Sequence, residues 1–85
     1  MNELERVLKA LANKRRLAIL KFLRRGQASV TDIADAIKLS FKATSRHLAI
    51  LASADIVEKE QEGLIVWHRL RTKMNPLVSE LLKHL

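Results

Sequence analysis

Three polar side chains fall on one side of a helix expected near the middle of the chain. Lys42, Ser45 and Arg46 are spaced three and four residues apart, so a helix that begins after Ser40 brings them to a common face. Lysine and arginine donate hydrogen bonds to guanine O6 and N7 or to phosphate oxygens, and serine bonds to either. The pattern predicts contact with a nucleic acid, and its alternative is an ordinary solvated helix face.

Residues near that face and at the start of an earlier helix are further candidates. Ser40 is first a helix cap, but its hydroxyl and the free N–H groups beside it also attract phosphate. Phe41 either packs on a thymine methyl group or folds into the core, and the sequence leaves both open. Cations at a helix start oppose the helix dipole. We therefore expect Lys14, Arg15 and Arg16 to contact the nucleic-acid backbone rather than to serve the fold alone.

The charge of the chain agrees with such a partner and is unevenly placed. The 85 residues include 16 Lys and Arg and 9 Asp and Glu, a net charge of +7. Residues 1–25 carry eight basic and two acidic groups, and residues 38–47 carry three basic groups and no acidic one. These segments favour phosphate contact. The net charge alone would also suit a ribosomal protein or a protein at an anionic membrane surface.

Several classes of chemistry are excluded or disfavoured. The chain has no cysteine, which rules out disulfides, thiolate metal sites and cysteine catalysis. There is no glycine-rich phosphate loop and no Ser/His/Asp grouping, so we expect neither an enzyme nor a cofactor. No apolar run approaches the roughly 18–20 residues of a membrane span, and the charged N-terminus is unlike a signal peptide. A cytoplasmic protein without a membrane partner is expected.

Apolar spacing predicts one mainly α domain over residues 1–85. Helices are expected at 2–11, 14–25, from Ser29 or Thr31 to 37, at 40–54 and from Asn75–Pro76 to 85, and strands at 56–60 and 64–70. Gly63 is expected to supply a positive φ in a loop of three to four residues. Two short helices followed by a hairpin predict a winged helix-turn-helix with a two-stranded wing. In that fold helix 40–54 enters the major groove of double-stranded DNA.

Residues 8–20, 40–51 and 62–70 resemble the ArsR family of winged helix-turn-helix repressors. The run from Ser45 to Leu48 carries much of the specificity, because its Ser-Arg-His-Leu sequence and the flanking apolar spacing agree together. The resemblance implies a homodimer, joined through the first and last helices, that represses transcription at a palindromic DNA operator until a ligand or metal releases it. It also implies that His47 faces the DNA.

The apolar stripes of the two terminal helices support the dimer separately. Exposed stripes of this kind usually mark an interface, and a chain of this length is marginally stable alone. The alternative is that both helices fold back onto one core. The predicted interface residues are Leu4, Val7, Leu8, Leu11, Val78, Leu81, Leu82 and Leu85.

The chain departs from the family at its metal sites. The start of the third helix holds Ser29 and Thr31 and no cysteine, so soft-metal sensing there is excluded. The last helix offers only Glu80 and His84, for which a surface ion pair is the simpler interpretation. We therefore predict no metal, and the sequence does not identify an effector. An organic or oxidative signal held between the terminal helices remains open.

The predicted wing also departs from the family, because residues 56–63 carry one lysine and three glutamates. Carboxylates at its tip should be repelled by phosphate. Arg69 either reaches phosphate or pairs with Glu58 and Glu60 across the hairpin. The acidic wing and Phe41 support an alternative function, a winged-helix protein-interaction module with weak or no DNA binding.

Overall fold

The structure is a computed structural model that describes residues 2–85. Along the described chain, five helices and one hairpin follow in the predicted order, which confirms the mainly α winged-helix class. Their bounds are α1 Glu3–Leu11, α2 Lys14–Leu23, α3 Val30–Ile37, α4 Phe41–Ser53, β1 Val57–Glu62, β2 Ile65–Leu70 and α5 Pro76–Leu82.

Polar side chains cap the start of every helix. Each accepts a hydrogen bond from a backbone N–H of the first turn, which satisfies donors that lack a partner within the helix. The caps are Asn2, Asn13, Ser29, Ser40 and Asn75. α2 ends two residues before its predicted end, and Gly26 then turns the chain with a φ of +135°. Lys38 closes α3 in a left-handed conformation, with a φ of +57°.

The hairpin is tighter than predicted. Glu62 pairs with Ile65, so the loop consists of two residues, Gly63 and Leu64. Gly63 has a φ of +62° at the first central position of the turn, where a type II′ hairpin turn favours glycine. At the base of the wing, Ala28 and His68 exchange two backbone hydrogen bonds of 3.0 and 2.8 Å. This bridge fastens β2 to the connection between α2 and α3.

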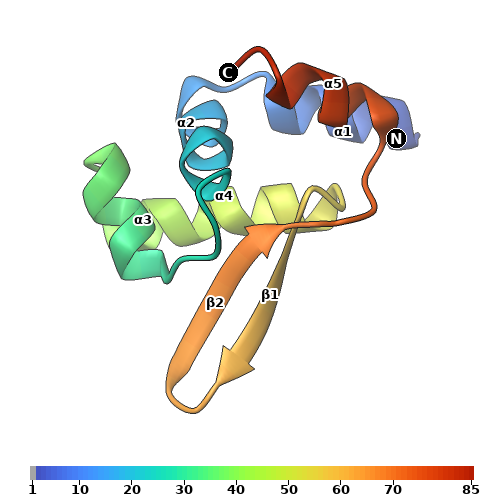
Figure 1. Ribbon diagram of the computed structural model, residues 1–85. Helices are drawn as coiled ribbons and strands as arrows, with labels where there is room; N and C mark the ends of the chain where they lie inside the picture. The colour runs from blue at the N-terminus through green and yellow to red at the C-terminus, as the bar shows by residue number, and fades with distance from the viewer. Residues whose placement is uncertain (1) are drawn as a thin grey trace.

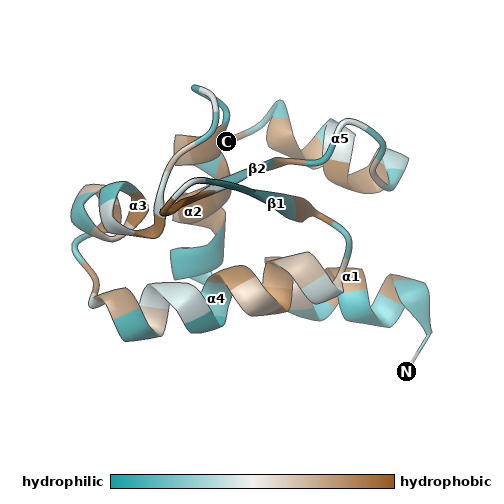
Figure 2. Ribbon diagram, turned by 90° about the horizontal axis from the view of Figure 1, so that it is seen from below, coloured by the Kyte–Doolittle hydropathy of each residue, from teal (hydrophilic) through white to brown (hydrophobic). Residues whose placement is uncertain are grey.

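The wing and the terminal helices lie at opposite ends of the molecule. Figure 1 shows the hairpin projecting from the end opposite α1, α5 and both chain termini. The core fills the space between these ends. Its side chains come from all five helices and the start of β1, with Ile19, Leu20, Ile33, Leu51 and Ile56 fully buried. In Figure 2, α4 lies along one side of the molecule with no other element beyond it.

The terminal helices differ from the prediction in how they use their apolar stripes. Val7, Val78 and Leu82 are buried within the single protomer, as members of its core. These three side chains cannot form a surface between subunits, so their assignment to the interface is corrected, and folding back onto one core is what they do.

Other members of the predicted interface remain accessible. Leu4 and Leu8 of α1 are 46% and 55% exposed, while Leu11, Leu81 and Leu85 are half-buried. Leu77 of α5, which was not predicted, is 59% exposed. The apolar surface left at this end is therefore smaller than the sequence pattern predicts, and it includes one residue that the pattern missed.

Candidate nucleic-acid interface

The two faces of α4 have opposite chemistry. Lys42 and Arg46 are exposed and Ser45 is half-buried, while Leu48 and Leu51 on the other side are buried in the core. Thr44 is fully buried as well, and its hydroxyl donates a 2.8 Å hydrogen bond to the carbonyl of Ser40 one turn earlier. The predicted polar face is thus accessible to a ligand, while the opposite face of α4 packs in the core.

At the start of α4, Ser40 is a helix cap and Phe41 lies outside the core. The Ser40 hydroxyl accepts a 3.1 Å hydrogen bond from the backbone N–H of Ala43, as expected of a cap. Phe41 is 60% exposed and lies outside the core. An exposed phenyl ring beside Lys42 extends the accessible face of α4 by an apolar contact, which suits a thymine methyl group.

The arginines at the start of α2 do not behave as predicted. The Arg15 guanidinium donates a 3.1 Å hydrogen bond to the carbonyl of Ile37, the last residue of α3. Arg16 donates to the carbonyls of Ala10 and Lys9, at 2.6 and 3.1 Å, in the last turn of α1. Both side chains thus reach the negative ends of other helices, where cations are favourable. Arg15 therefore makes a structural contact in the protomer, and its assignment as a DNA contact stays a prediction.

His47 is also turned into the protein. Its Nδ1 lies 3.2 Å from Nη1 of Arg16, and because a guanidinium can only donate, the ring nitrogen accepts. Burial, followed by the charges of Arg16 and Arg15, lowers the pKa of His47 below its ordinary value of 6.5. The neutral ring is therefore favoured beside α2, and the DNA-facing role that the resemblance implies stays a prediction.

Helical periodicity offered a signal for this position. His47 precedes the buried Leu51 by four residues, so both lie on the same side of α4, away from the face of Lys42 and Arg46. The partner on α2 was not predictable in the same way, because Arg16 is 31 residues away along the chain.

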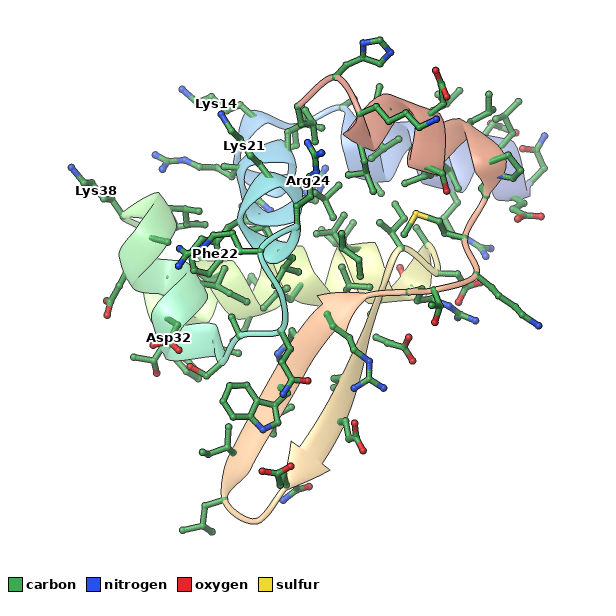
Figure 3. The ribbon with its side chains drawn as sticks, viewed as in Figure 1. Lys14, Lys21, Phe22, Arg24, Asp32 and Lys38 are labelled. Atoms are coloured by element: carbon green, nitrogen blue, oxygen red, sulfur yellow. The ribbon has the colours of Figure 1, made fainter. Side chains whose placement is uncertain are left out.

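These contacts also place the free cations around the start of α4. The Arg15–Ile37 bond brings the start of α2 to the end of α3, where Lys38 begins the turn that leads to α4. Figure 3 shows Lys14 and Lys38 projecting outward on the same side of the molecule. Lys38 was not among the predicted contact residues, although its position between α3 and α4 and its charge were visible in the sequence.

The wing is less acidic in effect than in sequence. Arg69 of β2 bonds to Glu60 at 2.6 Å and lies 3.8 Å from Glu58, which settles its two possible roles in favour of the cross-strand pair. The hydrogen bond that Arg69 donates to Glu60 is the main reason that the pKa of Arg69 is raised. The tip itself presents Leu64, whose side chain is fully exposed, beside Glu62. The carboxylates near the base are therefore largely balanced.

The last helix shows an ion pair where a metal site was considered. Glu80 lies 3.2 Å from Lys83 and 3.9 Å from His84, both on the same stretch of chain. Among residues 2–85 there is no group of three or more His, Asp or Glu side chains placed to hold a metal ion. No helix in the same range is long and apolar enough to cross a membrane.

The chain matches a known family over the helix-turn-helix and its surroundings. Residues 13–59, from the cap of α2 into β1, match the model described as bacterial regulatory protein, arsR family. The chain belongs to the ArsR family. This confirms the resemblance seen in the sequence, and it makes the protein a winged-helix transcriptional regulator of that family.

Relatives agree in fold and class. HlyU of Vibrio cholerae, a transcriptional activator, is 37% identical over 79 residues, which are 93% of this chain and 73% of HlyU. The arsenical resistance operon repressor of Bacillus subtilis is 32% identical over 82 residues, 94% of this chain and 78% of the repressor. The transcriptional regulator Rv0324 of Mycobacterium tuberculosis is 39% identical over 70 residues, but this chain spans only 31% of its length.

A solved structure extends the agreement to three dimensions. The winged helix-turn-helix DNA-binding domain of Mb0332 from Mycobacterium bovis, described as homodimeric, superposes with a TM-score of 0.83 at 35% identity. The match covers 96% of this chain and 73% of that one. These relatives are regulators of transcription, and they lend no support to the alternative of a protein-interaction module.

Proposed function

We propose that this ArsR-family regulator is a homodimer that binds a palindromic operator in double-stranded DNA and represses transcription by occupying it. The observation that carries the proposal is the free face of α4, where Lys42 and Arg46 are exposed while Thr44, Leu48 and Leu51 anchor the helix from behind. α3 precedes α4 through a turn of three residues, as in helix-turn-helix proteins.

Each residue of this surface has a proposed role. Lys42, Ser45 and Arg46 contact base edges or phosphates, and Phe41 packs on a thymine methyl group. Ser40, with the free N–H groups at the start of α4, and Lys14 hold phosphates and fix the register of the protein on the duplex. Arg15 and His47 bond within the protomer, and their contact with DNA stays a prediction.

The dimer is proposed to form through the end of the molecule that carries α1 and α5. Leu4, Leu8 and Leu77 are exposed there, with Leu11, Leu81 and Leu85 half-buried around them. The homodimeric state of the Mb0332 domain supports this assembly. Residues 1–85 then act as one DNA-binding domain in the cytoplasm, without an enzymatic activity.

Selection of DNA from a random pool by the purified protein tests the proposal. We expect a palindrome whose half-sites are about 34–36 Å apart, or a multiple of that distance, because two α4 helices must enter successive major grooves on one side of the duplex. Affinity should fall steeply with salt, since each neutralised phosphate releases a counterion. A pool that yields no palindrome at low salt contradicts the proposal, and a promoter reporter carrying the selected site distinguishes repression from activation.

Introducing a charge into the apolar end tests the dimer. Leu8→Glu should give a folded monomer in sedimentation measurements and weaken binding to the palindrome, while binding to a single half-site changes little. Lys21→Glu on α2, an exposed position outside this set of apolar residues, is the control. A Leu8→Glu protein that stays dimeric would place the interface elsewhere.

A further inference from the structure

Arg16 joins three elements with one side chain. Its Nε and Nη2 donate to the carbonyls of Ala10 and Lys9 in α1, at 2.6 and 3.1 Å, and its Nη1 donates to Nδ1 of His47 in α4, at 3.2 Å. The guanidinium is half-buried, and the residue itself lies in the first turn of α2. All three of its nitrogen atoms are thus engaged, on two helices that are remote from each other in the sequence.

The two helices joined in this way have different tasks in the proposed dimer. α1 carries the exposed Leu4 and Leu8 of the proposed interface, and α4 carries the face that reads DNA. α1 buries only Val7 and Ala10 among its nine residues, and two residues, 12 and 13, connect it to α2. Packing therefore holds α1 over a short length, and the Arg16 contacts fix the end of α1 that lies nearest the rest of the protein.

We propose that Arg16 is a positioning residue that locks α4 to α1 and thereby sets the distance and angle between the two reading helices of the dimer. The inference rests on the proposed function, since it concerns how a dimer measures the spacing of its half-sites. A planar guanidinium suits this task because its fixed fork of donors holds several acceptors in one geometry, which a lysine ammonium does not. His47 completes the lock as the acceptor on α4.

A series of operators with altered spacing tests the inference. Starting from the selected palindrome, one base pair is added or removed between the half-sites, which shifts them by about 3.4 Å and rotates them by about 35°. The wild-type protein should lose affinity sharply with each change, because its two α4 helices are held in one arrangement. Arg16→Gln should tolerate the changed spacing, with the affinity difference between spacings reduced by about 2- to 30-fold.

Lys14→Gln is the matched control, because it removes the same charge at the same helix end from a side chain that projects outward. It should weaken binding by the same factor at every spacing, so its profile stays parallel to that of the wild type. A parallel profile for Arg16→Gln would overturn the inference.

Two variants of His47 test the Arg16–His47 hydrogen bond at its acceptor. They keep the test decisive if Arg16→Gln does not fold. His47→Asn places an amide oxygen near the position of Nδ1, and it should retain the wild-type spacing profile. His47→Leu removes the acceptor and should flatten the profile as Arg16→Gln does. Equal spacing profiles for the two variants would contradict the inference. A wild-type protein that selects no palindromic DNA would contradict the proposed function instead.

Discussion

Arg15 and Arg16 at the start of α2 turn their guanidinium groups into the protein, whereas Lys42 and Arg46 on α4 extend their charges into solvent. In the sequence the two pairs look alike, since each consists of two basic residues on a predicted helix. The dipole of α2 makes a purely structural role for its first cations less favourable. Two of them nevertheless bond within the fold, because the carbonyl ends of α1 and α3 lie within reach of Arg16 and Arg15.

The difference shows that a cation must be judged against every helix end near it. The turn before α2 is short, with residues 12–13 between the helices, so the end of α1 lies within reach of Arg16. The end of α3 comes within reach of Arg15 through the packing of α2 against α3. Part of the net charge of +7 is therefore used inside the molecule, and the exposed cations proposed to contact DNA lie on α4, at Lys14 and at Lys38.

The largest expected effect comes from removing the free cations. Lys42→Ala together with Arg46→Ala should cost about 2–4 kcal/mol of binding free energy, roughly 30- to 700-fold in Kd. The slope of log K against log salt should become shallower by about 2 if both contact phosphate, while the free energy of unfolding stays within about 0.5 kcal/mol. Titrations at several salt concentrations and urea unfolding measure the two quantities. Unchanged DNA affinity would remove α4 from the interface and favour the protein-interaction alternative.

Much of the fold was predictable because it depends on local chemistry. Asn13 and Ser40 cap helices where the sequence indicated, and apolar spacing placed α1 and α5 within three residues of their observed ends. The hairpin loop was predicted one or two residues too long, since a positive φ at Gly63 suits several turn types.

The site was less predictable, because it depends on contacts between distant segments. The exposure of Lys42 and Arg46 followed from the helical period. The hydrogen bond between Arg16 and His47 could not be predicted in this way, because it depends on α2 packing beside α4. Val7 and Val78 show the same limit, since an apolar stripe has the same spacing whether it meets its own core or a partner.

A smaller effect is expected from two adjacent residues of equal charge. Arg15→Ala leaves the carbonyl of Ile37 without its charged donor and should lower the free energy of unfolding by about 1–3 kcal/mol. Lys14→Ala, at an exposed side chain, should change it by less than about 0.5 kcal/mol. Paired urea titrations test the contrast. Equal losses of stability would show that the guanidinium contact does not distinguish the two positions.

The smallest effect is expected from protonation of His47, the residue of α4 that contacts Arg16. In the folded protein burial lowers the pKa of His47, and the charges of Arg16 and Arg15 add to this, with Arg46 next to it on the same helix. Because the unfolded chain then binds more protons, stability is fully present above about pH 6.5 and falls as the pH decreases below that value. Burial lowers the pKa of His68 as well, so it contributes in the same direction.

His47→Asn separates the contributions of the two histidines to the pH dependence of stability. An amide oxygen accepts the hydrogen bond from Arg16 but does not titrate in this range. Urea unfolding between pH 7.5 and 5.5 should therefore show a weaker loss of stability for this variant than for the wild type, with the remainder due to His68. If the variant loses as much stability as the wild type, the Arg16–His47 contact does not depend on a neutral ring. If it loses less, one proton on His47 is enough to weaken the contact between Arg16 and α4.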